Sequence, residues 1–129
     1  MADEQPVHGT FCWNELVTRD TAKADKFYSE LIGWKFEDAS MTGMKYWMAK
    51  AGDKQACGMM KMPPDVPEQV PSHWMPYVTV DDVDSLVEKT KALGGETVHG
   101  PQDIPNVGRF LIVKDPTGAV VGFIQFPKQ

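Results

Sequence analysis

A chain of 129 residues can form one compact domain, or two small modules that share a core. Its net charge is −5 and its 13 Lys and Arg residues are scattered, which excludes the concentrated basic surface of a nucleic-acid-binding protein. No apolar run approaches the ~18 residues of a membrane helix, and residues 1–6 lack the apolar region of a secretory signal, so we expect a cytoplasmic protein.

The first half of the chain predicts one strand, one helix and three more strands. Residues 9–17 form a two-faced strand, with Trp13 and Glu15 on the same face. Asp20 or Thr21 begins a helix that ends at Gly33, and its amphipathic apolar stripe consists of Ala24, Phe27, Tyr28, Leu31 and Ile32. Strands are predicted at 34–38, 44–51 and 56–62, with turns at Gly43 and at Gly52-Asp53.

A proline-rich segment separates this half from a second one with the same order. Residues 63–72 contain four prolines, which exclude a helix or a central strand and indicate a stiff, extended linker. The second half predicts a strand at 73–80, a helix from Asp81 or Asp82 to Gly94-Gly95, and short strands at 96–99, 109–114 and 119–126. Asp115-Pro116-Thr117-Gly118 is a strong turn signal before the last strand. The sequence therefore predicts two βαβββ modules, 9–62 and 73–127, joined in one domain.

The doubled order resembles the vicinal oxygen chelate superfamily, which includes glyoxalase I, bleomycin-resistance proteins, fosfomycin-resistance enzymes and extradiol dioxygenases. The motifs that carry the resemblance are FYSELIGW at 27–34, the DPTG turn at 115–118, and Val80-Asp81 and Leu93-Gly94-Gly95 on either side of the second helix. HWMPY at 73–77 and IPNVGRF at 104–110 look like a glyoxalase-like or hydroxylase-like subgroup. The resemblance implies an α+β fold in which eight strands form an incomplete barrel, with helices outside and the ligand or metal inside.

The resemblance also implies where a metal would bind. Metal-using members take four His, Gln or Glu ligands from the first and last strands of the modules. By spacing, the corresponding positions here are Trp13, a residue within about two of Met60, Met75 and Gly122. Trp and Gly supply no side-chain ligand, and thioethers are poor ligands for Mg²⁺, Mn²⁺, Fe²⁺ or Zn²⁺. We therefore expect no metal, no other cofactor and no glyoxalase I chemistry.

Glu15 is the most conspicuous candidate for a functional side chain. A carboxylate beside Trp13 on an apolar face should have a raised pKa, and it could serve as a general base or as a counter-charge for a cationic ligand. The alternatives are a solvent-facing position or a salt bridge, for example with Arg109. His73 could act together with Glu15, or simply begin its strand after the prolines. Arg109 could hold an anionic ligand group, or be paired structurally.

The sequence leaves three functions open. The first is a metal-free protein that binds a small, mostly apolar or aromatic molecule in the cavity between the modules. Its walls would be Trp13, Tyr46, Met48, Met60, Met75 and Tyr77, with Glu15, His73 and Arg109 orienting the ligand. The second is a lyase, isomerase or dioxygenase-like enzyme that uses Glu15 and His73 with an unconventional metal or none. The third is a non-catalytic module of a larger complex. The resemblance also implies a homodimer, in which modules could be exchanged between chains.

Overall fold

The computed structural model describes residues 6–40, 44–105 and 107–127, and the chain divides into two compact units. The α1 unit comprises residues 13–75, and the α2 unit comprises the residues up to Cys12 and those from Pro76 onward. Each unit contains one helix and a mixed sheet in βαβββ order, which confirms the α+β class and the repeat. The turn predicted at Gly43 lies outside the described residues. Within the described residues, no helix has both the length and the apolar character needed to cross a membrane.

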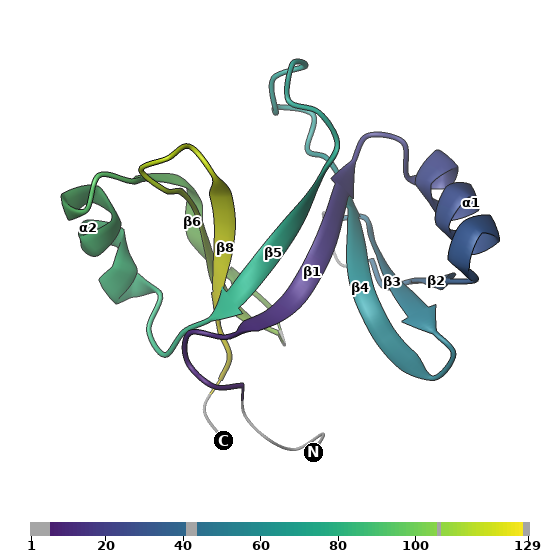
Figure 1. Ribbon diagram of the computed structural model, residues 1–129, viewed down its shortest axis with the longest axis horizontal. Helices are drawn as coiled ribbons and strands as arrows, with labels where there is room; N and C mark the ends of the chain where they lie inside the picture. The colour runs from purple at the N-terminus through teal and green to yellow at the C-terminus, as the bar shows by residue number, and fades with distance from the viewer. Residues whose placement is uncertain (1–5, 41–43, 106, 128–129) are drawn as a thin grey trace. The chain divides into compact units, whose positions relative to one another are not determined.

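The α1 unit is built on the strand order β2-β3-β4-β1 (Figure 1). Its strands are β1 (Phe11–Thr18), β2 (Lys35–Asp38), β3 (Tyr46–Ala51) and β4 (Lys54–Lys61). β1 and β4 are parallel, and β3 runs antiparallel to both β2 and β4. The helix α1 (Thr21–Ile32) connects β1 to β2. Its predicted ends are confirmed: Asp20 caps it by accepting a hydrogen bond from the Lys23 amide, and Gly33 ends it with φ of 80°.

Only part of the predicted apolar stripe of α1 is buried. The partly buried residues of the helix are Thr21, Ala24, Asp25, Tyr28 and Ser29, whereas Phe27, Leu31 and Ile32 are exposed. The ring of Tyr28 stacks on Trp34 at a centroid distance of 5.3 Å and meets Trp74 edge-on at 5.7 Å. The helix therefore packs through the side that carries Ala24 and Tyr28, and the rest of the stripe lies at the surface.

The proline-rich segment 63–72 is neither helix nor strand, as predicted, but it is not simply extended. Two turns are closed by backbone hydrogen bonds that Val66 and Val70 donate to carbonyls three residues earlier. Arg19 then donates to the carbonyl oxygens of Val70 at 2.6 Å and Pro67 at 2.9 Å. The segment is thus fastened to the residue that follows β1.

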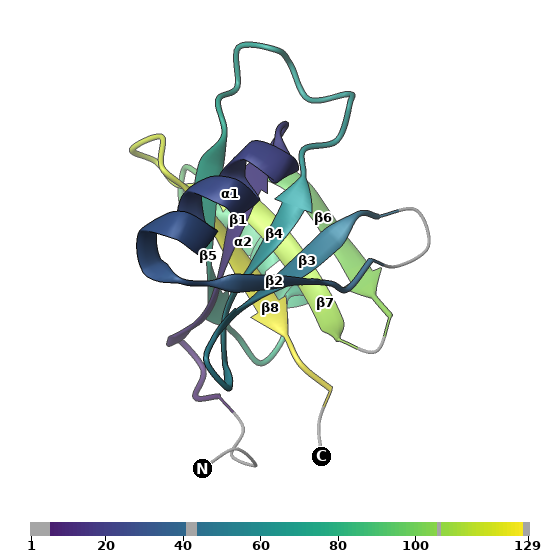
Figure 2. The ribbon, with the colours of Figure 1, turned by 90° about the vertical axis from the view of Figure 1, so that its right-hand side faces the viewer.

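The α2 unit repeats the topology with the strand order β5-β8-β7-β6. Its strands are β5 (His73–Thr79), of which residues 73–75 belong to the α1 unit, β6 (Glu96–Ile104), β7 (Gly108–Lys114) and β8 (Val120–Gln125). β5 and β8 are parallel, and β7 runs antiparallel to β8 and to β6, its neighbour in Figure 2. β6 continues well beyond the predicted 96–99. As an edge strand it tolerates Pro101, and register shifts on both sides of His99 accommodate the Gly100-Pro101 step.

The helix α2 (Asp84–Ala92) covers the core of the α2 unit. That core consists of Val80, Val83, Leu111 and Val113, and Leu86 and Val87 of the helix pack against it. The predicted start at Asp81 or Asp82 was wrong by two to three residues. Asp82 lies before the helix, where its carboxylate accepts a hydrogen bond from the Asp84 amide at 3.1 Å. The amide of Val83 donates to the Gln125 side chain of β8 at 2.9 Å, so both amides at the helix start have side-chain partners.

The turn between β7 and β8 is confirmed at Asp115–Gly118. The Asp115 carboxylate accepts hydrogen bonds from the amides of Thr117 at 2.8 Å and Ala119 at 3.1 Å. Gly118 completes the turn with φ of 97°, a value that a residue with a side chain rarely adopts.

Candidate functional site

Three predicted residues of the α1 unit form one chain of hydrogen bonds. β1 places Trp13 and Glu15 two residues apart, on the same face, and β3 supplies Tyr46. The indole Nε1 of Trp13 donates to the Tyr46 hydroxyl at 3.1 Å, and that hydroxyl is also hydrogen-bonded to the Glu15 side chain. Because the hydroxyl has a single proton and accepts from Trp13, it donates to the carboxylate. We call this arrangement the Trp13–Tyr46–Glu15 chain.

Gly58 makes this chain sterically possible. On β4 it lies between Glu15 of β1 and Met48 of β3 in the register. A Cβ atom at Gly58 would overlap the hydroxyl and ring of Tyr46, so only glycine leaves room for this ring above β4. The sequence analysis missed Gly58, although a glycine inside a strand pattern is a signal for such a close approach.

Glu15 is buried, with 7% of its surface exposed, and no other charged residue among those described is buried. Burial, followed by the negative charge of Glu15, raises the pKa of Tyr46. The same two causes raise the pKa of the Cys57 thiol from 9.0 to about 11. Both groups therefore keep their protons at neutral pH, and Tyr46 remains a donor to Glu15. The predicted raised pKa of Glu15 itself stays a prediction.

The α2 unit contains residues equivalent in position to Glu15 and Gly58. Tyr77 lies opposite Gly122 in the parallel pair of β5 and β8, as Glu15 lies opposite Gly58 in the pair of β1 and β4. A Cβ at Gly122 would overlap the Tyr77 ring, so this glycine also makes room for an aromatic side chain. The internal repeat therefore extends to single residues, and it replaces a polar carboxylate in one unit with a tyrosine in the other.

The strand register also identifies the fourth position at which metal-using members would have a ligand. Gly58 is the counterpart of Gly122, so the fourth ligand position lies at Gly58, within the two residues allowed around Met60. Trp13, Gly58, Met75 and Gly122 then offer no imidazole, carboxylate or amide side chain. Across residues 6–40, 44–105 and 107–127, no three His, Cys, Asp or Glu residues gather as a possible metal site. This set of donors does not fit the divalent ions that metal-using members bind.

The methionines expected in the wall have different surroundings. Met48 and Met60 are partly exposed, and the register puts them on the same face of the α1-unit sheet as Glu15. Met75 is buried. Met48 and Met60 therefore give the Trp13–Tyr46–Glu15 chain a flexible apolar border.

His73 and Arg109 each have a defined partner within their own unit. His73 begins β5, and its Nδ1 lies 2.8 Å from the Pro71 carbonyl oxygen. Arg109 forms ion pairs with Asp84 and Asp103, both at 3.1 Å, and these bonds raise the pKa of Arg109. A part for either residue in ligand binding stays a prediction.

Comparison with known proteins identifies the family. Residues 10–123 match the model of the Glyoxalase/Bleomycin resistance protein/Dioxygenase superfamily. The chain belongs to this family. The resemblance inferred from the repeated motifs is therefore confirmed, and this membership covers both units.

Named relatives agree with this assignment. "Putative glyoxylase CFP32" of Mycobacterium tuberculosis is 40% identical over 119 residues, which cover 91% of this chain and 46% of that protein. "Anthracycline biosynthesis protein DnrV" of Streptomyces peucetius is 28% identical over 123 residues, or 86% of this chain and 45% of that protein. The chain thus spans about half the length of these curated relatives.

Two solved structures show the same fold at low sequence identity. Methylmalonyl-CoA epimerase from Mycobacterium tuberculosis matches with a TM-score of 0.64 and 11% identity, covering 97% of this chain and 93% of the other. The hypothetical protein BH1468 from Bacillus halodurans matches with a TM-score of 0.68 and 10% identity, covering 94% and 96%. These similarities establish the two-module fold.

Proposed function

We propose that this member of the family binds a small molecule that has an aromatic or apolar body and a hydrogen-bond donor. The molecule binds without a metal, on the face of the α1-unit sheet that carries the Trp13–Tyr46–Glu15 chain. The observation that carries the proposal is the buried carboxylate of Glu15, which Tyr46 orients by a hydrogen bond. A carboxylate accepts hydrogen bonds and donates none when ionised, so the ligand group that suits Glu15 is a hydrogen-bond donor.

The surroundings of Glu15 fit the apolar part of such a ligand. Trp13 and Tyr46 offer flat rings, and the partly exposed Met48 and Met60 can adapt to different shapes. A hydrogen bond to a charged group contributes about 1.5–3 kcal/mol, which corresponds to roughly tenfold or more in affinity. The name of DnrV places that relative in anthracycline biosynthesis, and anthracyclines are polycyclic aromatic compounds. This supports an aromatic ligand class for the present chain.

A pair of probes tests the role of Glu15. 2-Naphthol and 2-methoxynaphthalene have the same ring system, but only the former donates a hydrogen bond. We expect calorimetric titration to show roughly tenfold tighter binding of 2-naphthol, and we expect Glu15→Gln to abolish most of that preference. Glu37→Gln is the matched control, because Glu37 is an exposed carboxylate paired with Lys50. Equal binding of the two probes by the unaltered protein would contradict the proposal.

Elemental analysis of the purified protein tests the metal-free part. We expect substoichiometric Zn, Fe, Mn and Ni, and no change in probe affinity after treatment with EDTA. A tightly held metal at one equivalent per chain, together with loss of probe binding on its removal, would contradict this part of the proposal.

An enzymatic function is the second candidate, and the same carboxylate favours it. A buried Glu15 held by Tyr46 is suitably placed to accept a proton from a bound substrate. A screen with methylglyoxal–thiol adducts and catechols separates the two candidates. Turnover that falls ~100-fold or more in Glu15→Gln, with His73→Ala as a second variant, would favour the enzyme. Binding of probes without turnover of any substrate in the screen would favour the binding protein.

A further inference from the structure

A second charged group lies on the face of the α1-unit sheet that carries Glu15. The strand register puts four residues in one row across this sheet: Glu15, Gly58, Met48 and Glu37. Lys50 is two residues beyond Met48 on β3, so its side chain is on the same face as that row. The ammonium of Lys50 lies 3.4 Å from the Glu37 carboxylate, which agrees with this placement of both side chains.

The end of the sheet face around Lys50 has more positive than negative charge. Lys35 of β2 lies directly opposite Lys50 of β3 in the antiparallel register, and like charges at such positions repel each other. Glu37 offers one carboxylate for these two ammonium groups. Lys35 itself has no ion pair within residues 6–40, 44–105 and 107–127. An anionic group of a ligand would therefore be attracted to this end of the face.

Glu15 and Lys50 are far enough apart to contact opposite ends of one small molecule. Two strand spacings and a two-residue step along β3 put their Cα atoms about 12 Å apart. The flexible stem of the lysine lets its ammonium approach a ligand held at Glu15. Met48 lies between the two and is partly exposed, so it offers an adaptable apolar surface to the body of the ligand.

We infer that the ligand of this site carries an anionic group at the end opposite its hydrogen-bond donor, and that Lys50 binds this group. The donor end binds at Glu15, so this inference rests on the proposed function. It narrows the ligand class to molecules with a donor, an aromatic or apolar body and a carboxylate, phosphate or sulfate group. Lys50 is the better anchor of the two lysines, because 35% of its side chain is exposed and solvent screens it less than the exposed Lys35.

A second pair of naphthalene probes tests for the anionic group. 6-Hydroxy-2-naphthoic acid and its methyl ester have the same hydroxyl and ring system, but only the acid is anionic at pH 7. We expect calorimetric titration at low salt to show roughly twofold to fivefold tighter binding of the acid, as for a partly exposed ion pair. This preference should become smaller as the salt concentration rises to about 0.5 M, whereas binding of the ester should change little.

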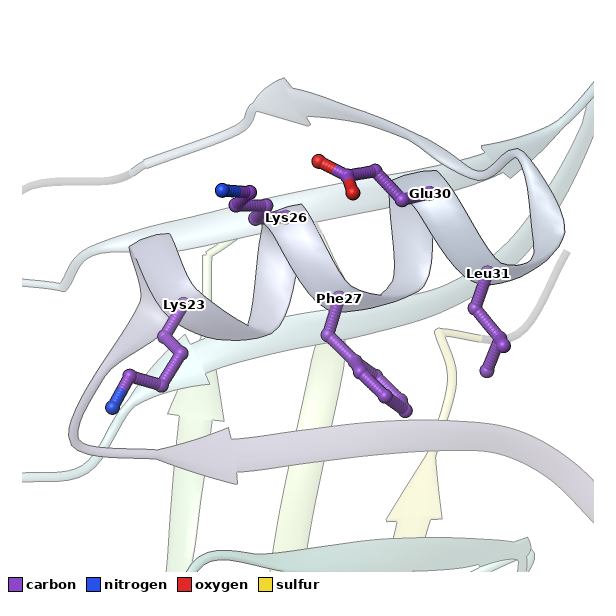
Figure 3. Close-up of a pocket in the computed structure, with 5 residues that line it drawn as sticks. All are labelled: Lys23, Lys26, Phe27, Glu30 and Leu31. Atoms are coloured by element: carbon purple, nitrogen blue, oxygen red, sulfur yellow. The ribbon is translucent and has the colours of Figure 1, made fainter.

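Substitutions of the two partners in the Lys50–Glu37 pair should act in opposite directions. Lys50→Gln should remove most of the preference for the acid, and Lys50→Arg should retain it, because the positive charge remains. Glu37→Gln should increase the preference about twofold, since it removes a carboxylate that competes for Lys50. Lys26→Gln is the matched control: Lys26 is an exposed lysine that projects from α1 (Figure 3), and its loss should leave the preference unchanged. Circular dichroism checks that each variant is folded.

The two pairs of probes separate a failure of this inference from a failure of the proposed function. Suppose that the unaltered protein prefers 2-naphthol to 2-methoxynaphthalene but binds the acid and its ester equally. The binding site then stands, and the anionic end of the ligand is wrong. A preference for the acid that survives in Lys50→Gln, or that falls equally in Lys26→Gln, would also overturn the part assigned to Lys50.

Discussion

The two helices occupy equivalent places in the repeat, yet their apolar side chains have different surroundings. Leu86 and Val87 of α2 pack against an apolar core in which Val83 and Leu111 are fully buried. Neither helix contains a buried residue of its own, but α1 leaves Phe27 and Leu31 largely exposed. The same backbone order therefore places apolar helix residues against a core in one unit and leaves them at the surface in the other.

The two sheets also differ. In the α2 unit the Tyr77 ring lies at Gly122, whereas the equivalent place at Gly58 in the α1 unit holds the Tyr46 ring and the buried carboxylate of Glu15, to which Tyr46 donates. Burying a charged group costs free energy, so buried charged groups are usually hydrogen-bonded or ion-paired, or take part in function. The α1 unit therefore carries the candidate site, and the α2 unit carries the apolar core of Val80, Val83, Leu111 and Val113.

The largest expected effect is on the free energy of unfolding, and it compares a residue in the core beneath α2 with an exposed residue on α1. Leu111→Ala should lower the free energy of unfolding by about 2–5 kcal/mol, because it opens a cavity in the α2 core. Leu31→Ala should change it by less than about 0.5 kcal/mol, because that side chain is exposed in the monomer. Urea denaturation measures both changes. Equal losses would mean that α1 is packed as tightly as α2.

Substitution of the two glycines sharpens the comparison between the sheets. Gly58→Ala and Gly122→Ala should each cost about 1–3 kcal/mol, since each added Cβ overlaps a tyrosine. Only Gly58→Ala should also reduce the preference for 2-naphthol over 2-methoxynaphthalene, because only it displaces Tyr46 from Glu15. Calorimetric titration of both variants makes the distinction. Loss of that preference in Gly122→Ala alone would contradict the assignment of the site.

The pH dependence of stability provides a third, smaller test. The pKa of Cys57 is raised from 9.0 to about 11 in the folded chain, so the folded state holds this proton more tightly than the unfolded state. The associated stability is complete below pH 9 and is lost as pH rises toward 11. We expect a loss of about 1 kcal/mol between pH 8 and pH 10 that becomes smaller in Cys57→Ala. Raised pKa values of Tyr46 and Cys12 act in the same direction and remain in that variant.

The smallest expected effect isolates the charge of Glu15. Burial is the first cause of the raised Cys57 pKa and the Glu15 charge is the second, so Glu15→Gln should lower that pKa only modestly. The Cβ chemical shift of Cys57, followed against pH by NMR, reports the change in pKa, because the thiol is buried and an alkylating reagent would reach it only after the fold opens. Glu37→Gln should leave the profile unchanged, and an identical profile in Glu15→Gln would show that the carboxylate does not act on the thiol.

Local chemistry explains why so much of the architecture is predictable from sequence. The Asp20 cap, the Gly33 stop and the Asp115–Gly118 turn depend on residues within a few positions of one another, and all three are confirmed. The spacing from these markers also located Trp13 and Glu15 on one face of the first strand. Short segments therefore define where these helix ends and this turn lie in each half of the repeat, and the sequence alone is enough to predict them.

The tertiary structure decided what those segments contact. The Gln125 side chain of β8 accepts from the Val83 amide just before α2, and on α1 Tyr28 meets the rings of Trp34 and Trp74 while Phe27 and Leu31 are exposed. The hydrogen bonds from Trp13 to Tyr46 and from Tyr46 to Glu15 join residues about 30 positions apart, across a glycine whose missing side chain leaves the room. Periodicity states which side chains share a face, but the partner of a face depends on strand register and on competing contacts between distant residues.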